Sequence, residues 1–477
     1  MSRTRLLLVL HAHLPWIPRA HPEREWLLQA ISDCYLPLLD ALERTPEAKL
    51  TISVSPTLEA MLAERSLGRD FDAFCDRQRA SVTPLSTRAS AAVAFWRARY
   101  RAQRGHATSV LPRLSRLQRK HRVELIACNA THAFLPLLAQ CPPAVNAQVA
   151  IALDSHQRRF GRRPRGLWPA ECGYFPGAEA CFAENGLRYF FVDTHGLTRA
   201  TPPANHREPA FCENGVAVLA RDPEASEQVW SRRTGYPGDA AYLDYHHRLE
   251  GHRVFRVTGR EEKEAWQPEA AFARAREHAA HFVESRRRRA REGAQWLVAP
   301  YDAELFGHWW LEGPTFLAEV ARLVAASDEL LPSTASEAVR AVSEADCVAP
   351  AASSWGRGGQ SAVWLDESNA SFWPRLIRAS ERMVALSRAH ANASGLFEAA
   401  LDQALRELLL AQASDWPFLI EAKTNAGYAL SRFEDHLVAF SRLADEVERG
   451  AIDATHLASR RRTHNLFGRL DFRVYGA

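Results

Sequence analysis

The sequence predicts an α/β fold built on a parallel sheet that is either open or closed into a barrel. Short apolar runs recur along the chain, and each is followed by a longer stretch of helical composition. Strands that alternate with helices form parallel sheets through right-handed crossovers. The runs expected to form strands are residues 6–10, 50–54, 123–126, 166–168, 189–192, 216–220 and 296–298.

The first apolar run, Leu6 to Leu10, is expected to be a buried strand near the N-terminus. It is only five residues long before His11 interrupts it. A membrane-spanning helix needs roughly 18–20 apolar residues in succession, and no stretch of the chain approaches that length. We therefore expect a soluble protein without a secretion signal and without membrane contact, and the scattered cysteines favour a reducing cytoplasm.

Three stretches depart from the alternating pattern. Residues 67–120 lack strand signals and contain many arginines, which predicts a helical insertion. Residues 222–250 are rich in polar, aromatic and turn-forming residues, which predicts a long loop over the barrel mouth. The composition changes again after Pro350, so we expect a catalytic unit over 1–350 and a linker with a helical unit over 351–477.

Composition excludes several classes of function. The apolar fraction is 47% and the formal net charge is only +4, with arginines interleaved among acids, so nucleic acid is not an expected partner. The dense arginine run at 286–291 is expected on a solvated helix face. The eight cysteines form no C-x-x-C pair, which argues against a disulfide framework or a structural zinc site.

Polar residues gather directly after the predicted strands. In a parallel barrel this position is the carboxyl-terminal rim, where active sites are built. Structural polar residues would not favour that end, so the clustering indicates function. These residues are His11, His13, Ser53, Ser55, Thr131, His132, Glu171, Asp193, His195, Asp302 and Glu304.

Two segments that contain some of these residues, 166–174 and 299–310, place carboxylates among aromatic residues and turn formers. Cleavage of a glycosidic bond needs two carboxyl groups that face each other across a sugar. Aromatic neighbours stack on sugar rings and exclude water. The alternative is a pair of ordinary turns in which each acid caps a helix. From the residues alone, either Asp302 or Glu304 could donate the proton that such cleavage requires.

The histidines leave alternatives open. His11 and His13 form a His-x-His pair at a strand end, a common zinc geometry that a carbohydrate deacetylase would use. His132 and His308 are either donors to sugar hydroxyls or hydrogen-bonded core histidines.

The motifs together resemble glycoside hydrolase family 57, and within it most closely the 1,4-alpha-glucan branching enzymes. The resemblance spans almost the whole chain. It implies a (β/α)7 barrel, a helical C-terminal domain that completes the cleft, a retaining mechanism and no metal cofactor. The motifs are His11-Ala-His13-Leu-Pro-Trp16, Trp168-Pro-Ala-Glu171-Cys-Gly, Tyr301-Asp302-Ala-Glu304-Leu-Phe-Gly-His308-Trp-Trp310, Ser353-Ser-Trp355-Gly, the segment from Val229 to Asp239, and Ser414-Asp415-Trp416.

Site roles follow from this resemblance residue by residue. Glu171 matches the nucleophile and Asp302 the general acid/base, and the resemblance makes both His11 and His13 hydrogen-bonding partners that bind no metal. Tyr236 matches a tyrosine on a loop that keeps water away, although a plain surface turn is the alternative. Trp355 and Trp364 are expected to line glucose subsites for a reason of their own, because both lie in the glycine-rich segment that leads from the barrel to the helical domain; ordinary core packing is the alternative. The other expected substrate contacts are Trp16, His132, Trp230, His308, Asp415 and Trp416.

The predicted activity is cleavage of α-1,4 glucan linkages and transfer of the released chain to form α-1,6 branches. The expected partner is amylose or a glycogen-like polysaccharide. An alpha-amylase or a 4-alpha-glucanotransferase would share the first half of this reaction. A zinc-dependent deacetylase would use His11 and His13 as ligands, and a glycan-binding protein without activity would need the aromatic residues but not Asp302.

Overall fold

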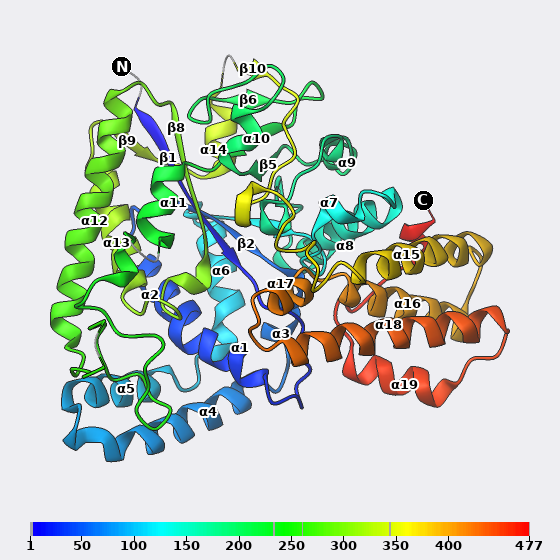
Figure 1. The fold of residues 1–477 in the computed structure, drawn as a ribbon, viewed down its shortest axis with the longest axis horizontal. Helices are drawn as coiled ribbons and strands as arrows, with labels where there is room; N and C mark the ends of the chain where they lie inside the picture. The colour runs from blue at the N-terminus through cyan, green and yellow to red at the C-terminus, as the bar shows by residue number, and fades with distance from the viewer. Residues whose placement is uncertain (1–2, 232–233, 260, 343–344, 477) are drawn as a thin grey trace.

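The computed structural model describes residues 3–231, 234–259, 261–342 and 345–476. Its framework is a ten-stranded sheet that contains seven successive parallel strands (Figure 1). The spatial order of these strands from β1 onward equals their order in the chain, and β8 returns to pair with β1. The seven strands are β1 (Thr4–Ala12), β2 (Leu50–Val54), β3 (Val123–Cys128), β4 (Gly166–Trp168), β5 (Tyr189–Val192), β7 (Ala217–Ala220) and β8 (Trp296–Asp302).

The ring of seven strands is incomplete between β7 and β8. Among the described residues the strand ladder stops there, and a backbone hydrogen bond crosses from Asp222 N–H to the Val298 carbonyl oxygen (2.8 Å). Beyond β7 the sheet continues with antiparallel β6 (Ala210–Phe211) and then β10 (Asp346–Cys347), while β9 (Leu330–Pro332) pairs with the start of β1. The expected (β/α)7 fold is confirmed, as a barrel with an open seam.

Side chains of β1 alternate between the barrel interior and the surrounding helices. Leu7 and Val9 belong to a buried cluster formed mainly by the strands, whereas the alternate leucines of β1 belong to the larger cluster shared with the helices. Burial on both faces explains why this strand is a continuous apolar run. Since side chains alternate with a period of two, His11 continues the inward-facing series of Leu7 and Val9 at the strand end.

The same register places two further acids at this end of the barrel. On β8, Trp296 and Val298 face the interior, and the series continues to Asp302. On β5, Phe191 faces the interior and Asp193 follows two residues later. The interior positions are therefore apolar along the strands and polar at their carboxyl ends.

Helices cover the outside of the sheet, with α12 running along one side of the molecule (Figure 1). The helices associated with the barrel are α1 (Arg24–Ala30), which continues through a π-helical turn at Ile31–Tyr35 into α2 (Leu36–Arg44), then α3 (Pro56–Leu62), α7 (Leu135–Leu138), α8 (Pro142–Phe160), α9 (Ala178–Glu184), α10 (Thr194–Thr198), α11 (Pro223–Trp230), α12 (Pro268–Arg291), α13 (Gly313–Ala325) and α14 (Ala335–Arg340).

The stretch predicted as a helical insertion is helical. It forms α4 (Leu67–Val82), α5 (Ser90–Gln103) and α6 (Val110–Arg119). In Figure 1, α4 and α5 lie at the lower edge of the molecule, whereas α6 lies closer to the sheet and leads into β3.

The segment 222–250 differs from the expected long loop because it begins with the eight-residue helix α11. Asp222 caps this helix, since its side chain accepts a hydrogen bond from Ala225 N–H. A short 3-10 turn follows at Tyr236–Gly238, and residues 232–233 lie outside the described part of the chain.

The sequence predicted that the arginine run on α12 would lie on a solvated helix face, but one of these arginines is buried. Arg286 is fully buried, and its Nη1 donates to Asp222 Oδ1 at 2.8 Å. The expectation was wrong at this position because the cap of α11 supplies a buried carboxylate that pairs with the guanidinium.

Five helices form the C-terminal region on the opposite side of the molecule from α12 (Figure 1). The start of α17 reaches the barrel, where Ser414 N–H donates to the His132 carbonyl oxygen (3.0 Å). None of the described helices is long and apolar enough to cross a membrane. The five helices are α15 (Phe372–Ala389), α16 (Gly395–Ala411), α17 (Asp415–Glu421), α18 (Ala426–Glu448) and α19 (Ala454–Thr463).

Candidate active site

Glu171 lies in a strained turn directly after β4. It belongs to a 3-10 turn (Ala170–Cys172) and has φ 63° and ψ 22°, the left-handed region. This conformation costs an L residue roughly 1–2 kcal/mol. The neighbouring Cys172 (φ 50°) and His132 (φ 60°) are left-handed as well. Strained backbone of this kind concentrates at functional sites, where the surrounding structure aims particular side chains.

Two donors from the C-terminal third of the chain hold the Glu171 carboxylate. Trp355 donates its indole N–H to Oε2 (2.8 Å), and Ser414 donates its hydroxyl to Oε1 (2.9 Å). Burial raises the pKa of Glu171, and these two hydrogen bonds oppose the shift without cancelling it. The arrangement fixes the orientation of the carboxylate.

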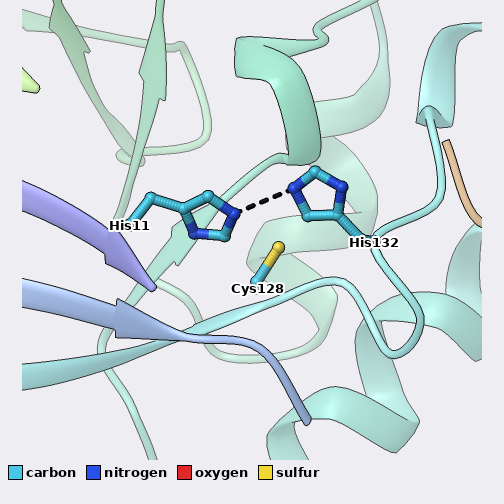
Figure 2. A group of neighbouring side chains, drawn as sticks. All are labelled: His11, Cys128 and His132. Carbon is cyan, nitrogen blue, oxygen red and sulfur yellow. Dashed lines mark hydrogen bonds between the residues drawn. The ribbon is translucent and has the colours of Figure 1, made fainter. Parts of the chain in front are cut away.

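A chain of hydrogen bonds runs from His11 through His132 and Ser414 to Glu171, and every donor in it points towards Glu171. A carboxylate only accepts, so Ser414 gives its hydroxyl hydrogen to Glu171 and must accept from Nδ1 of His132 (2.8 Å). A neutral His132 then accepts at Nε2 from Nε2–H of His11 (2.8 Å). Nδ1 of His11 is left to accept from Ser53 Oγ (3.2 Å). Figure 2 shows the two rings facing each other through their Nε2 atoms.

His11, His132 and Cys128 lie together as a metal site would require, with ligand atoms within 4.8 Å of one another (Figure 2). Burial and the neighbouring histidines lower the pKa of both His11 and His132 well below the usual range, so the rings are neutral. Burial raises the pKa of the Cys128 thiol well above its usual range, so it keeps its hydrogen. With Nε2 of His11 also carrying a hydrogen, the group fits a hydrogen-bonded cluster better than a set of metal ligands.

His13 belongs to a second group that links the barrel to α17. Its ring stacks on His132 with centroids 3.8 Å apart, and Nε2 lies 3.1 Å from both carboxylate oxygens of Asp415. Nδ1 lies 2.8 Å from Ser55 Oγ, and the backbone N–H of His13 donates to Glu304 Oε1 at 3.1 Å.

Asp302 stands beside His11, to which it is matched in the register of β8 and β1. Within the described part of the chain, its carboxylate has no hydrogen-bond partner. Burial raises its pKa well above the usual range, and the charges of Glu304, Glu171 and Asp415 raise it further. Asp302 therefore retains a proton at a pH where an ordinary aspartate has lost it.

Glu304 is held in place from two sides. Tyr35 donates its hydroxyl to Oε1 at 2.5 Å, and the same oxygen accepts the backbone N–H of His13. Burial raises the pKa of Glu304 to about 7. Of the two acids that the sequence left open, Glu304 is bound by donors, whereas Asp302 has a free carboxylate.

Aromatic side chains border the carboxylates on one side. Trp355 is half-buried, and its ring lies 5.1 Å from Trp168 and 6.3 Å from Trp230. Trp230, at the end of α11, is 39% exposed. An exposed indole beside a half-buried carboxylate offers a stacking surface for a sugar ring.

A second exposed aromatic surface was not predicted from the sequence. Trp309 is 49% exposed, and its ring stacks on Tyr245 with centroids 5.3 Å apart and planes 6° from parallel. Its backbone N–H donates to the Glu304 carbonyl oxygen (3.2 Å), which places it close to the acidic group. Trp310 next to it is buried, and no signal in the sequence distinguishes these two tryptophans.

Comparison with known proteins identifies the family. The sequence profile of glycosyl hydrolase family 57 matches residues 7–349. The chain belongs to glycosyl hydrolase family 57. The profile of the C-terminal region of 1,4-alpha-glucan branching enzymes matches residues 375–475, which cover most of the C-terminal helices.

Individual relatives cover almost the whole family 57 chain. A 1,4-alpha-glucan branching enzyme of Thermococcus kodakarensis is 32% identical over 93% of this chain and 74% of its own length. The structure of the family 57 branching enzyme of Pyrococcus horikoshii superposes with a TM-score of 0.93 at 31% identity, covering 100% of this chain and 97% of its own. The alpha-amylase AmyC of Thermotoga maritima reaches 0.92 at 32% identity, covering 100% and 99%.

The structure brings together only part of the predicted site of this family 57 chain. Glu171, Asp302, His11, His13, His132, Asp415 and Trp355 form one contiguous group, with Trp230 at its edge. His308 is buried elsewhere. Its Nδ1 lies 3.5 Å from Asp33, which also accepts from Arg253 (2.5 Å), and its Nε2 lies 3.5 Å from the Tyr245 hydroxyl.

Four aromatic residues predicted to contact substrate are buried. Tyr236 does not face the site, because its hydroxyl lies 2.8 Å from His281 Nδ1 and its ring stacks on His278 of α12. Trp364 is only 1% exposed and stacks on Phe134. The placement of both side chains at the surface of the cleft was wrong. Trp16 and Trp416 are buried as well.

Trp364→Ala is expected to lower the free energy of unfolding by about 3–5 kcal/mol, because it empties a large buried site. The KM for amylose of the folded variant should stay within about twofold of the parent value. Denaturant unfolding followed by fluorescence, together with kinetics at low temperature, measures both quantities. Trp309→Ala is the matched exposed control and should leave stability unchanged. A stable Trp364→Ala protein with impaired amylose binding would contradict this assignment to the core.

Glu304→Gln is expected to move the alkaline limb of the pH–kcat profile to lower pH by about one unit. The charge of Glu304 raises the pKa of Asp302, so removing this charge lets Asp302 lose its proton earlier as the pH rises. The glutamine oxygen can still accept from the Tyr35 hydroxyl, which preserves the packing. Glu213→Gln, at an exposed position, is the control. An unmoved limb, or one displaced to higher pH, would contradict the coupling.

Proposed function

We propose that this family 57 chain is a 1,4-alpha-glucan branching enzyme that uses Glu171 as nucleophile and Asp302 as general acid and base. The observation that carries the proposal is the contrast between the two carboxylates. Glu171 accepts hydrogen bonds from Trp355 and Ser414, which favour its charged form. Asp302 has no such donor among the described residues, and its surroundings favour its protonated form.

In the first half of the reaction, the Glu171 carboxylate forms a bond to C1 of the glucose at the scissile linkage. As the C1–O4 bond breaks, Asp302 gives its proton to O4 of the departing glucan. The product is a glucan ester of Glu171. Its formation inverts the configuration at C1, and the aromatic side chains of Trp355 and Trp230 beside the site keep competing water away from the ester.

In the second half, the 6-hydroxyl of an acceptor glucan attacks C1 of this ester. Asp302, now a carboxylate, takes the hydroxyl proton, and Glu171 departs as a carboxylate. A second inversion at C1 gives net retention and an α-1,6 branch. Every proton moves between Asp302 and the sugars, so the proposal calls for no metal or organic cofactor.

We assign the exposed aromatic surfaces to glucan binding. Trp230 lies on the Trp355 side of the carboxylates, and Trp309 with Tyr245 lies on the Glu304 side. A glucan chain could stack at both. The unit 1–350 would then supply the two catalytic carboxylates, and 351–477 would complete the cleft through Trp355, Ser414 and Asp415.

An alpha-amylase would perform the same first half and admit water in the second, and the similarity to AmyC keeps this candidate in view. Proton NMR of amylose incubated with the protein separates the two activities. Branching predicts that anomeric signals of α-1,6 linkages appear with little increase in reducing ends. New reducing ends without α-1,6 signals would show an amylase, and chains lengthened only through α-1,4 linkages would show a 4-alpha-glucanotransferase.

Trp230→Ala is expected to lower the ratio of α-1,6 linkages to new reducing ends by about three- to tenfold. The exposed indole beside Trp355 would otherwise shield the ester from water while an acceptor glucan binds. Total cleavage should fall much less. Leu430→Ala, which removes an exposed apolar side chain on α18, is the control. An unchanged ratio would assign the exclusion of water to other residues.

The cellular setting proposed for this activity is the cytoplasm, with a glycogen-like polymer as product. All eight cysteines are free in the structure, as in proteins of reducing compartments. Elemental analysis of the purified protein tests the rival deacetylase directly. If the protein contains stoichiometric zinc, and chelation removes both the zinc and the activity, the mechanism given above is wrong and the deacetylase is favoured.

A further inference from the structure

His195, on the short helix α10, lies between two groups that can only accept hydrogen bonds. Its Nδ1 is 3.0 Å from Oδ1 of Asp193, and its Nε2 is 2.6 Å from the carbonyl oxygen of Gly359. A neutral imidazole carries one N–H and could satisfy only one of these acceptors. Satisfying both requires a hydrogen on each ring nitrogen, which is the charged imidazolium form.

The charges around this ring suit a cation. Burial opposes ionisation of Asp193, but the hydrogen bond from His195 and the charge of Arg221 outweigh it and lower the pKa of this carboxyl. Arg221 pairs with the other carboxylate oxygen (2.7 Å). Cys172 nearby keeps its hydrogen, because burial raises the pKa of its thiol well above the usual range. Arg357, in the segment that contains Gly359, pairs instead with Glu421 (2.5 Å).

Gly359 closes a tight loop that carries Trp355. The Gly359 carbonyl oxygen accepts the backbone N–H of Ser354 (3.0 Å) as well as Nε2–H of His195. Between these residues, Trp355 uses its backbone N–H on the Glu171 carbonyl oxygen (3.0 Å) and its indole N–H on the Glu171 carboxylate (2.8 Å). We call residues 353–360 the strap. A shift of the Gly359 carbonyl would move the donor that holds the proposed nucleophile.

The strap fits closely against the histidine. Gly359 has φ +74°, and a Cβ atom at this position would come within 2.5 Å of His195 Cε1. Two features therefore favour glycine at this position: the left-handed backbone conformation, and the lack of space for a Cβ atom beside the His195 ring. The strap therefore lies directly against the ring of His195, joined to it by the hydrogen bond to the Gly359 carbonyl oxygen.

We propose that His195, as an imidazolium bridging Asp193 and Gly359, is a positioning residue that holds the strap so that Trp355 keeps its hydrogen bond to Glu171. His195 touches neither glucan nor the reacting atoms in this account. It links this half-buried histidine to the orientation of the nucleophile. The inference rests on the proposed function, because it gives Glu171 the nucleophilic role.

The protonation state can be tested on the resting wild-type protein, without turnover. Two-dimensional ¹H–¹⁵N NMR of protein labelled with ¹⁵N-histidine distinguishes imidazolium from both neutral tautomers. At about pH 6, one histidine that is absent from the spectrum of His195→Gln is expected to show two protonated nitrogens. A neutral tautomer for this histidine at that pH would overturn the proposal, whatever the enzymatic activity proves to be.

Kinetics tests the positioning role. In His195→Gln, kcat on amylose at about pH 6 is expected to fall roughly tenfold with KM changed less than twofold, because the nucleophile and not the glucan loses a contact. A kcat within twofold of the wild-type value, or a rise in KM as large as the fall in kcat, would overturn the positioning role.

Two further variants guard against a trivial loss of structure. Gly359→Ala keeps the imidazole but displaces the strap, and should reproduce the fall in kcat with a cooperative thermal transition. His106→Gln, at an exposed position on another part of the chain, should match the wild type. Absence of glucan transfer by the wild-type protein would refute the proposed function itself, whereas normal wild-type transfer with an unaffected Gly359→Ala variant would refute only the role of the strap.

Discussion

Glu171→Gln is expected to reduce turnover of amylose by about four orders of magnitude or more. The substitution preserves the shape of the side chain and removes the charged oxygen that would bond to C1, so no glucan ester can form. Both cleavage and branching should disappear together, because both pass through this ester. Reducing-end assays and linkage analysis of the same samples measure the two losses.

The Glu171 carboxylate is not expected to stabilise the fold. Burial raises the pKa of Glu171, so ionisation of this group is unfavourable inside the protein, and its neutral replacement should unfold at a similar or higher temperature. Glu184→Gln, an exposed change on α9, serves as the control. Retention of more than a few per cent of wild-type activity by Glu171→Gln would refute the nucleophile assignment.

Asp302→Asn is expected to lower kcat on amylose by roughly 10²–10⁴-fold, the usual contribution of a general acid. In the first half of the reaction, followed as the initial burst of fluoride release, the loss should be much smaller with an α-maltosyl fluoride, because fluoride departs without being protonated. This difference between substrates separates a proton donor from a nucleophile, whose removal impairs both substrates alike.

The pH dependence gives a second criterion for Asp302. Its raised pKa keeps the proton in place as the pH rises, and activity is lost at the alkaline side when that proton leaves. This limb should therefore appear when the wild-type protein cleaves amylose and be absent from its burst of fluoride release, which needs no proton. Asp328→Asn, at an exposed position, should leave the limb on amylose unchanged. Equal losses of amylose cleavage and of the fluoride burst in Asp302→Asn would contradict the acid role.

The barrel and its acidic rim could be predicted from local patterns. Leu6 to Leu10 form a strand buried on both faces, so the sequence shows an unbroken apolar run there. The two-residue period of a strand then carries the inward-facing series of Leu7 and Val9 to His11, and that of Trp296 and Val298 to Asp302. The alternation of side chains along a strand depends only on neighbouring residues in the chain, so it can be predicted from the sequence.

The orientation of the tryptophans could not be predicted in the same way. Trp355 and Trp364 lie in one glycine-rich stretch, yet the first bonds Glu171 and the second stacks on Phe134 in the core. An indole satisfies either environment, so composition does not distinguish them. Tyr236 was misplaced for a related reason. Its turn was visible in the sequence, but the histidine of α12 that bonds its hydroxyl is 45 residues away.

The support of the nucleophile also depends on contacts between distant segments. Ser414 reaches Glu171 across 243 residues, and His11 reaches His132 across 121. The tautomers of these histidines follow only when all partners are known together. Sequence motifs identified several members of this network, but the direction of its hydrogen bonds required the fold.

Trapping the covalent intermediate tests the central claim most directly. Asp302→Asn, incubated with an α-maltosyl fluoride, quenched in acid and digested, is examined by mass spectrometry. Because the second half of the reaction lacks its base, the glucan ester should accumulate, and the peptide containing Glu171 should gain the mass of one maltosyl group. A maltosyl group on a peptide containing Glu304 or Asp415 instead, or release of fluoride without any adduct, would contradict the mechanism.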